Sequence, residues 1–204
     1  MPGLFVTLEG IDRSGKTTQA RLLCEALGDR ALAVREPGGT AVGERVRELL
    51  KDTQIEIDPR AEALLFAAAR AALVAEVIRP ALEDGKVVVS DRFLDSSLAY
   101  QGAARGLGVE EVARMNELAT GGLVPDLTIL LDLPLASAAE RAGVEVDRFE
   151  KEGAGLQESV RAAYEELVAA EPRRWVRVDA TRPPEQVHRE VLAAVERVLA
   201  GASA

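Results

Sequence analysis

The stretch that decides the fold is Gly10-Ile11-Asp12-Arg13-Ser14-Gly15-Lys16-Thr17, which fits the pattern G-x-x-x-x-G-K-[ST]. It directly follows an apolar run, Leu4 to Leu8, and directly precedes a stretch with helical periodicity. Glycines at these positions let backbone N–H groups turn inward around phosphates, while the lysine reaches the β and γ oxygens. We therefore expect the segment Gly10 to Thr18 to hold the phosphates of a nucleoside triphosphate at the start of a helix.

Short β-branched runs alternate with longer helical stretches along the rest of the chain. The strand candidates are Leu4 to Leu8, Ala31 to Val34, Lys86 to Val89, Leu127 to Leu131 and Trp175 to Val178. Helices are expected at about residues 16–27, 40–51, 59–83, 110–119, 135–141, 155–170 and 183–199. Five short strands separated by helices predict an α/β fold of three layers, with a mainly parallel sheet flanked by helices. The 204 residues fit one domain, 1–204.

The composition narrows the class of protein. Apolar residues make up 48% of the chain and charged residues 29%, which is the balance of a soluble globular protein. The formal net charge of −9 argues against sequence-independent binding to a nucleic acid polymer, because such binding needs a Lys/Arg surface. The single cysteine, Cys24, cannot form an internal disulfide, and no signal peptide or membrane-spanning apolar run is visible. We expect a cytoplasmic protein with neither a membrane nor a nucleic acid as partner.

One segment has no apolar period. Ala142 to Gly153 is rich in charge, is flanked by glycines and lies between two predicted helices. Such a segment is typical of a short mobile lid, and also of a plain solvated connector. The residues alone leave both interpretations open.

Three further segments carry polar and aromatic groups that a scaffold does not need. Arg35-Glu36-Pro37-Gly38-Gly39-Thr40 follows the second strand, and Ser90-Asp91-Arg92-Phe93 follows the third apolar run. Ligand loops of open parallel sheets lie at such strand ends. The third segment, Ser96-Ser97-Leu98-Ala99-Tyr100-Gln101-Gly102, comes shortly afterwards. A switch GTPase would carry an Asn-Lys-x-Asp motif, which is absent, and Asp132 is followed by Leu133 rather than by the glutamate common in ATPases.

Taken with the phosphate loop, these segments resemble the thymidylate kinase family of P-loop nucleoside monophosphate kinases. The matching motifs occur in family order: Glu9 to Thr17, Arg35 to Gly39, Asp91 to Phe93, Ala99 to Gly102, Pro125 to Thr128, Asp147 to Glu150 and Val178 to Ala180. Asp-Arg inside the phosphate loop, together with Glu-Pro-Gly-Gly downstream, is specific to this family among P-loop kinases. The resemblance covers nearly the whole chain. It implies the nucleoside monophosphate kinase fold and a dTTP-biosynthesis enzyme that phosphorylates dTMP to dTDP, with ATP as donor and Mg²⁺ as cofactor.

The resemblance also implies an acceptor site. The residues that it places around dTMP are Asp12, Glu36, Pro37, Phe66, Arg70, Arg92, Ser96, Ser97, Tyr100 and Gln101. By resemblance the Asp12 carboxylate meets the 3′-hydroxyl, and Arg92 holds the acceptor phosphate. Tyr100 packs under the deoxyribose where a 2′-hydroxyl would lie. On the residues alone, Asp12 could instead be a turn residue that braces the loop.

Phe66 and Arg70 lie four residues apart, and hence on one face of a predicted helix. From the residues alone Phe66 is a core side chain, whereas the resemblance stacks it on thymine. By the same resemblance Arg70 reaches the base or the acceptor phosphate, and Ser97 lies near the polar edge of the base. Phe93 and Tyr164 keep the core interpretation.

Phosphoryl transfer needs positioning and charge neutralisation more than a nucleophilic side chain. The implied catalytic residues are Lys16, Arg13, Arg92, Asp12 and Arg141. The implied lid residues, which would close over the site and exclude water, are Arg141, Arg148 and Glu150. Adenine would lie beside Ala180, Thr181 and Arg182, and Mg²⁺ would be held, partly through water, by Thr17 and Asp91. A homodimer is expected from the family only.

Two other functions stay open. One is a sister kinase of the same fold that acts on another nucleoside monophosphate or on a deoxynucleoside. The other is a nucleotide-regulated binding module. A sister kinase would prefer a base other than thymine, and a module would show no turnover that depends on an acceptor.

Overall fold

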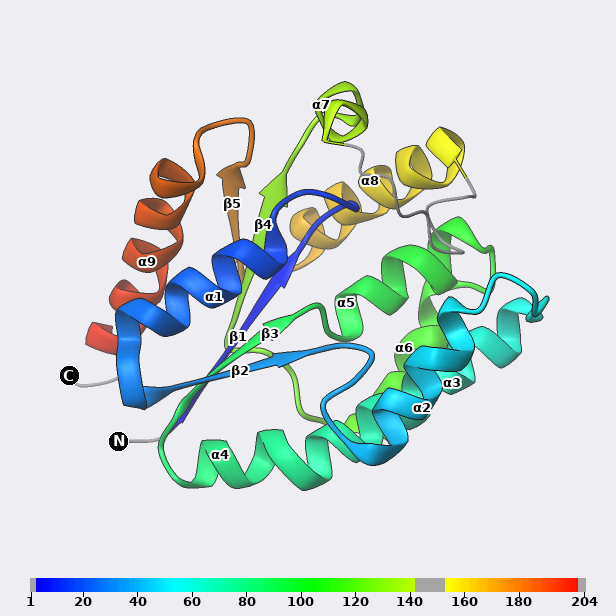
Figure 1. The fold of residues 1–204 in the computed structure, drawn as a ribbon, viewed down its shortest axis with the longest axis horizontal. Helices are drawn as coiled ribbons and strands as arrows, with labels where there is room; N and C mark the ends of the chain where they lie inside the picture. The colour runs from blue at the N-terminus through cyan, green and yellow to red at the C-terminus, as the bar shows by residue number, and fades with distance from the viewer. Residues whose placement is uncertain (1–2, 142–152, 202–204) are drawn as a thin grey trace.

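All five predicted strands form, and together they build one parallel sheet (Figure 1). The computed structural model describes residues 3–141 and 153–201, in which β1 to β5 span Leu4–Glu9, Ala31–Arg35, Val87–Asp91, Leu127–Asp132 and Trp175–Asp179. Their order across the sheet is β2-β3-β1-β4-β5. The strand that leads into the phosphate loop is therefore central. Every neighbouring pair is parallel, which confirms the predicted sheet.

The carboxyl ends of the strands meet at one edge of the sheet, and each strand ends in a charged residue. These residues are Glu9, Arg35, Asp91, Asp132 and Asp179. The register places Asp91 of β3 beside Leu8 of β1 on one side and beside Arg35 of β2 on the other. Since ligands of open parallel sheets bind beyond the carboxyl ends of the strands, this edge is where a site is expected.

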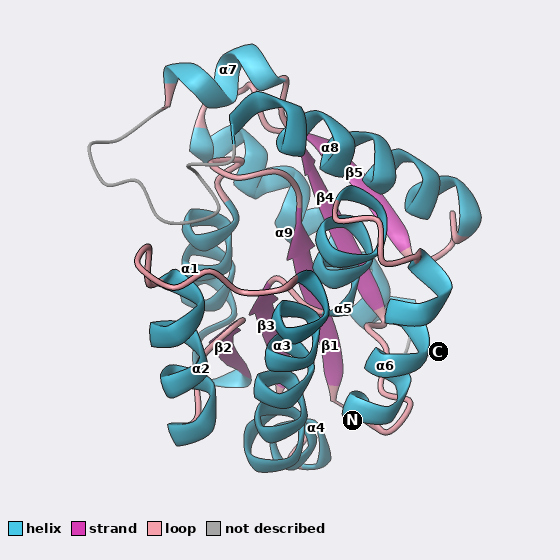
Figure 2. Ribbon diagram, turned by 90° about the vertical axis from the view of Figure 1, so that its right-hand side faces the viewer, coloured by secondary structure: helices cyan, strands magenta, loops and turns pink. Residues whose placement is uncertain are grey.

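Helices cover both faces of the sheet (Figures 1 and 2). On one face α1 (Lys16–Leu27) packs against α9 (Pro184–Gly201). On the other face lie α4 (Arg79–Glu83), α5 (Leu94–Ser97) and α8 (Gly153–Ala170). The other α-helices of the described residues are α2 (Ala41–Lys51), α3 (Pro59–Leu73), α6 (Val109–Thr120) and α7 (Leu135–Glu140). This is the predicted three-layer α/β arrangement.

Side chains that alternate along β1 enter two different cores. Leu4 and Val6 belong to the cluster that includes apolar residues of α1 and α9. Phe5 points to the other face and meets Phe93 edge to face, with ring centroids 4.8 Å apart. The core positions predicted for Phe93 and Tyr164 are confirmed, because both side chains are buried.

Two helical segments differ from the sequence prediction. The expected helix 59–83 widens to a π-helical turn at Val74–Ile78, between α3 and α4. Pro80 gives a reason, since proline lacks an N–H and its ring clashes with the carbonyl four residues earlier. Residues 94–104, for which no helix is predicted, are helical, with a π-helical part at Leu98–Ala104. Serine, tyrosine and glycine are weak helix formers, so packing against α6 and α8 decides this conformation.

The segment interpreted as a lid, 142–153, lies outside the described residues except for Gly153 at the start of α8. Arg148 and Glu150 therefore also lie outside them. Within residues 3–141 and 153–201, no helix is long and apolar enough to cross a membrane.

Candidate functional site

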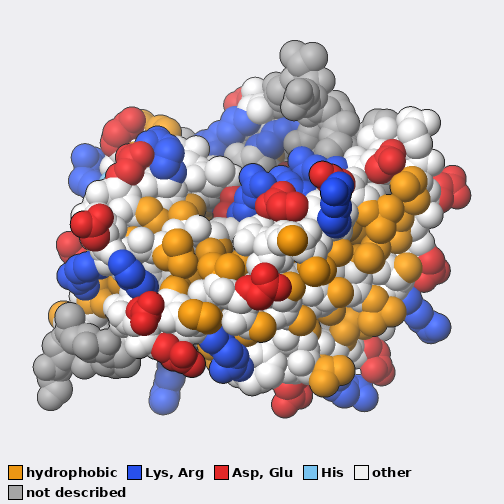
Figure 3. All heavy atoms as spheres, turned by 60° about the horizontal axis from the view of Figure 1, so that its bottom comes forward, with side chains coloured by type: hydrophobic (Ala, Val, Ile, Leu, Met, Phe, Trp, Pro, Cys, Tyr) orange, Lys and Arg blue, Asp and Glu red, His pale blue; other side chains and the backbone are white. Residues whose placement is uncertain are grey.

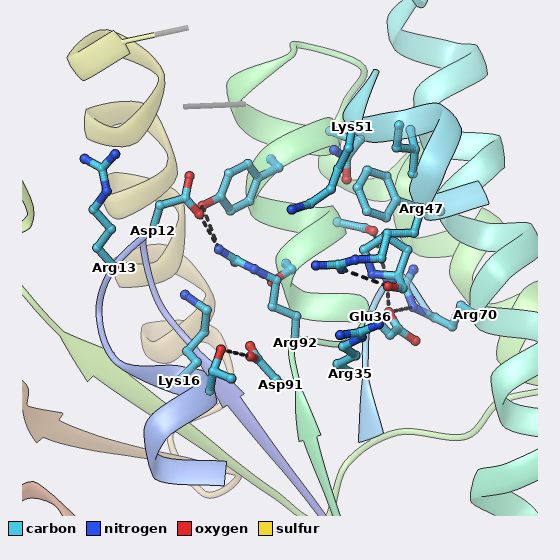
Figure 4. A pocket seen from close by; sticks show the side chains of 18 residues that line it. Asp12, Arg13, Lys16, Arg35, Glu36, Arg47, Lys51, Arg70, Asp91 and Arg92 are labelled. Atoms are coloured by element: carbon cyan, nitrogen blue, oxygen red, sulfur yellow. Dashed lines mark hydrogen bonds and ion pairs between the residues drawn. The ribbon is translucent and has the colours of Figure 1, made fainter. Parts of the chain in front are cut away.

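The carboxyl edge of the sheet opens into a cavity of about 340 Å³ (Figure 4). Its wall consists of Asp12, Arg13, Lys16, Thr17, Arg35, Glu36, Pro37, Arg47, Leu50, Lys51, Phe66, Arg70, Asp91, Arg92, Ser96, Ser97, Tyr100 and Gln101. All ten residues predicted around dTMP are among them. Arg35, Arg47, Leu50 and Lys51 also line the cavity and are not predicted as site residues. Of these four, Arg35 alone had a sequence signal, because it belongs to the motif Arg35-Glu36-Pro37. The other three are residues of α2 and carried no such signal.

The side chain of Lys16 is held by backbone oxygens of the phosphate loop itself. α1 begins at Lys16, directly after Gly15, whose φ of 98° favours glycine. Lys16 is buried, and its Nζ donates to the backbone oxygens of Gly10 at 3.1 Å and Ile11 at 2.8 Å. Burial and the neighbouring Arg92 lower the pKa of Lys16 to about 8. An ammonium that is partly stripped of water interacts strongly with anions, so the loop suits phosphate.

Two side-chain oxygens lie together beside the phosphate loop and the end of β3. Thr17 Oγ1 donates to Asp91 Oδ2 at 2.5 Å, and both residues line the cavity. Mg²⁺ prefers oxygen ligands, keeps several waters and usually takes one or two protein ligands besides substrate phosphates. Among residues 3–141 and 153–201 no three His, Cys, Asp or Glu side chains cluster as a metal site. The hydroxyl of Thr17 and the carboxylate of Asp91 are oxygen groups of the kind that Mg²⁺ accepts as ligands.

Arg92 lies at the centre of the charged groups in the cavity (Figure 4). Its backbone is left-handed, with φ at 73°. Its guanidinium pairs with Asp12 and donates to Gly10 O at 3.2 Å, Ser96 Oγ at 3.1 Å and Tyr100 Oη at 3.2 Å. The guanidinium carbon also lies 5.0 Å from the centre of the Tyr100 ring, in cation–π range. Arg92 is thus a fixed positive charge beside the phosphate loop.

The buried carboxylate of Glu9, which belongs to the matched motif but was assigned no role from the sequence, supports this arginine through Ser96. Glu9 accepts hydrogen bonds from the backbone N–H of Phe93 at 2.8 Å, Ser96 Oγ at 2.6 Å and Tyr164 Oη at 2.8 Å. Burial is the main cause that raises the pKa of Glu9 to about 7, while the hydrogen bonds from Ser96 and Tyr164 oppose the shift. A glutamate that ends an otherwise apolar strand is the sequence signal that could have identified it.

Asp12 is held from two sides. Its Oδ1 accepts from Arg92 and from Tyr100 Oη at 3.0 Å, and its Oδ2 accepts from Gln157 Nε2 at 2.7 Å. Burial raises the pKa of Asp12, but Arg92, Lys16 and these hydrogen bonds outweigh burial and hold the pKa below its usual value. Asp12 is therefore an ionised acceptor at the mouth of the loop. The partner Gln157, from α8, is not predicted by sequence.

The far end of the cavity contains a second, deeper arginine. Arg70 Nε donates to Glu36 at 2.8 Å, and Nη2 donates to Phe93 O at 3.2 Å and Ser97 Oγ at 3.1 Å. Nη1 donates to Asn116, a further residue that is not predicted by sequence. Burial raises the pKa of Glu36, and Arg70 opposes that shift. This end of the cavity is a buried, hydrogen-bonded wall.

Phe66 and Gln101 complete the same end. Phe66 lines the cavity and packs against the small apolar cluster around Leu50, so both the core and the stacking interpretations have a structural counterpart. Gln101 Nε2 donates to the buried Glu62 at 2.9 Å, which fixes the orientation of this amide.

Arg141 and residues 180–182 lie outside the cavity wall. Arg141 donates to the backbone oxygens of Arg13 at 3.2 Å and Ala180 at 2.7 Å, so it joins the phosphate loop to the loop after β5. The Thr181 hydroxyl donates a hydrogen bond to Asp179 Oδ1 at 2.6 Å, and Arg182 forms an ion pair with Glu190 of α9. Arg13 itself lines the cavity.

Known proteins resemble the chain over most of its length. A model of the thymidylate kinase family matches residues 8–191. The thymidylate kinase of Desulforudis audaxviator is 53% identical over 188 residues, which cover 89% of this chain and 85% of the relative. That of Leifsonia xyli is 52% identical over 196 residues, 93% of each chain. A crystal structure of thymidylate kinase from Ehrlichia chaffeensis, 32% identical, superposes with a TM-score of 0.80 over 96% of this chain and all of the other. The chain therefore belongs to the thymidylate kinase family.

Proposed function

We propose that the protein transfers the γ-phosphoryl group of ATP to dTMP, giving ADP and dTDP for dTTP synthesis. The observation that carries this proposal is the cavity in which Arg92 links a phosphate loop to a buried, hydrogen-bonded wall around Arg70. One end suits the phosphates of both substrates, and the other end suits a base. Membership of the thymidylate kinase family supports the same pair of substrates.

In the proposed reaction an oxygen of the acceptor phosphate forms a bond to the γ-phosphorus, and the bond from that phosphorus to the β–γ bridging oxygen breaks. The cations around the transferring group are Lys16, Arg13 and Arg92, all of which line the cavity. Arg92 holds the acceptor phosphate, since it lies between the loop and the acceptor side. Arg141 acts from the edge by holding the backbone of Arg13.

The base is assigned to the Arg70 end. A guanidinium has five N–H donors, and Arg70 directs most of them to Glu36 and to three further acceptors. Its charge is already balanced by the adjacent carboxylate, so it suits a neutral carbonyl of thymine better than a phosphate. Phe66 offers its ring for stacking, and Ser97 lies beside the same edge.

The sugar lies between these ends in the proposal. Asp12 accepts the 3′-hydroxyl, and Tyr100 occupies the space that a 2′-hydroxyl would need. The contact between Tyr100 Oη and Asp12 places the two side chains together, which supports this assignment. Ser96 and Gln101 complete the wall on that side.

Mg²⁺ belongs to the proposal as the cofactor. Thr17 and Asp91 would hold it, because their oxygens lie together at the phosphate loop. The ion neutralises charge on the β- and γ-phosphates when bound. The chain's own contribution is to keep the threonine hydroxyl and the carboxylate of Asp91 at the start of α1.

The adenine of ATP is placed beside residues 180–182, because Arg141 ties this loop to the phosphate loop. We also propose a cytoplasmic location. The one cysteine of the chain, Cys24, is a free thiol, which fits a reducing compartment.

A homodimer is the proposed assembly. Large apolar side chains are exposed on α2, α3 and α6, and orange side chains gather at the right of Figure 3, where these helices lie. Leu64 of α3 and Leu118 of α6 are the most exposed of them on these helices, with Leu118 at 87%. Such a patch is typical of an interface between protein chains. Sedimentation of Leu118→Glu beside the unaltered protein tests it, and a dimer for both would place the interface elsewhere.

An assay that couples ADP release to a panel of acceptors tests the proposed activity. We expect the highest kcat/KM with dTMP, lower values with dUMP and other monophosphates, and no acceptor-dependent turnover with thymidine. A preference for another base would mean a sister kinase, and ATP binding without acceptor-dependent turnover would mean a binding module.

A further inference from the structure

Gln157, near the start of α8, holds both the backbone and the side chain of Asp12. Its Oε1 accepts from the Asp12 N–H at 3.1 Å, and its Nε2 donates to Asp12 Oδ2 at 2.7 Å. The two residues are 145 positions apart in the sequence. An amide can donate and accept at once, so one side chain fixes both the loop backbone and the rotation of the carboxylate.

The remaining hydrogen-bonding capacity of Asp12 follows from a count. A carboxylate has about four acceptor positions, two on each oxygen. Among the described residues, Oδ1 accepts from Arg92 and Tyr100, which uses both of its positions, and Oδ2 accepts from Gln157. One position on Oδ2 remains for a donor that comes from a ligand.

Arg92 is the group to which Asp12 would turn if the hydrogen bonds from Gln157 were lost. Arginine and carboxylate readily form two parallel hydrogen bonds, and Asp12 at present gives Arg92 only its Oδ1. A rotation of the carboxylate would bring Oδ2 to the same guanidinium. That pairing would turn the open acceptor position of Oδ2 in a different direction, so Nε2 of Gln157 keeps Oδ2 turned away from the arginine.

We propose that Gln157 is a positioning residue that aims Asp12 Oδ2 at a hydroxyl of the acceptor's sugar, and so selects acceptors that carry this hydroxyl. The inference rests on the proposed function, in which Asp12 meets the 3′-hydroxyl of dTMP. Gln157 acts through Asp12 and needs no contact with the substrate.

Gln157→Leu keeps the size of the side chain and removes both hydrogen bonds. The two acceptors to compare are dTMP and 2′,3′-dideoxythymidine monophosphate, which lacks the 3′-hydroxyl. We expect kcat/KM for dTMP to fall about tenfold, mainly through KM, and that for the dideoxy acceptor to fall less than about threefold. Gln157→Glu should show a larger loss with dTMP, because it places a second carboxylate against Asp12.

Ser159→Ala is the matched control, since among residues 3–141 and 153–201 the Ser159 hydroxyl bonds only to Gly155 O of the same helix. It should leave both acceptors unchanged, and thermal unfolding checks that each variant is folded. Equal losses with both acceptors, or no loss in either Gln157 variant, would overturn the inference. If the unaltered protein shows no turnover with dTMP, the proposed function fails instead.

Discussion

The cavity has an arginine–carboxylate pair at each end, and the two pairs differ in burial. The side chains of Arg70 and Glu36 are 1% and 3% exposed, whereas those of Arg92 and Asp12 are 19% and 23% exposed. Burial raises the pKa of Glu36, but at Asp12 the nearby cations and hydrogen bonds outweigh burial and lower the pKa. The deep pair is a fixed part of the wall, while the shallow pair keeps access to water and to charged ligands.

The backbone of one residue joins the two ends. Phe93 directly follows Arg92, its N–H donates to Glu9, and its carbonyl accepts from Arg70. The carboxylate of Glu9 is therefore positioned to affect both pairs. Because the shallow end is proposed to bind charged ligands and the deep pair is buried in the wall, substitutions at the shallow end should lower activity with little loss of stability, whereas those at the deep end should also lower stability.

Lys16→Met tests whether the shallow end serves activity rather than stability. We expect turnover with every acceptor to fall about 10³-fold, because the variant lacks the ammonium that would neutralise negative charge on the transferring phosphoryl group. The free energy of unfolding should not fall by more than about 1 kcal/mol, since burial disfavours the charged ammonium. Steady-state kinetics and urea unfolding measure the two effects. Activity within threefold of the unaltered protein would remove Lys16 from the mechanism.

Arg70→Met tests whether the deep end contributes to the stability of the fold. It leaves Glu36 buried without its partner, so we expect the free energy of unfolding to fall by about 3–5 kcal/mol. Arg92→Met is the matched control at the shallow end, where water can replace the lost partner and the loss should be about 1 kcal/mol. Similar losses in the two variants, measured by urea unfolding, would contradict the difference between the ends.

The sequence was sufficient for the sheet, because each strand is a local pattern, and its motifs together with the family resemblance identified residues that line both ends of the cavity. Its limit is clearest at Glu9, Asn116 and Gln157. Each lies in an ordinary strand or helix pattern and acquires its role only through partners more than 40 positions away. The helix at residues 94–104 was missed for a similar reason, since tertiary packing outweighs the weak helix propensity of its residues.

Arg13→Gly tests the contribution of the loop arginine to catalysis without changing either arginine–carboxylate pair. Arg13 has a φ of 64°, which glycine adopts without strain, so the change removes the charge and leaves the loop geometry compatible. We expect kcat to fall by about tenfold while KM for dTMP moves little, the pattern of an interaction formed mainly in the transition state. A kcat near that of the unaltered enzyme would mean that Arg141 or Arg148 supplies the charge instead.

Glu9→Gln tests the carboxylate that lies between the two ends. Burial raises the pKa of Glu9 from 4.5 to about 7, so the folded protein binds a proton more tightly than the unfolded chain does. The tighter binding of this proton stabilises the folded protein. The stabilisation is fully present below about pH 4.5 and is lost as the pH rises to about 7.

Glutamine keeps the shape of Glu9 but cannot titrate, so its stability should lack this decrease between pH 4.5 and 7. Three donors point at the carboxylate, an arrangement that favours its ionised form, and we therefore expect the difference to be only about 1 kcal/mol. Burial also raises the pKa of Asp95. Asp95 is present in both proteins, so the part of its pH dependence that is independent of Glu9 cancels when their stabilities are compared. Urea unfolding at several pH values measures the effect. Parallel stability curves for the two proteins would show that Glu9 is ionised throughout, held so by Arg92 and its three donors.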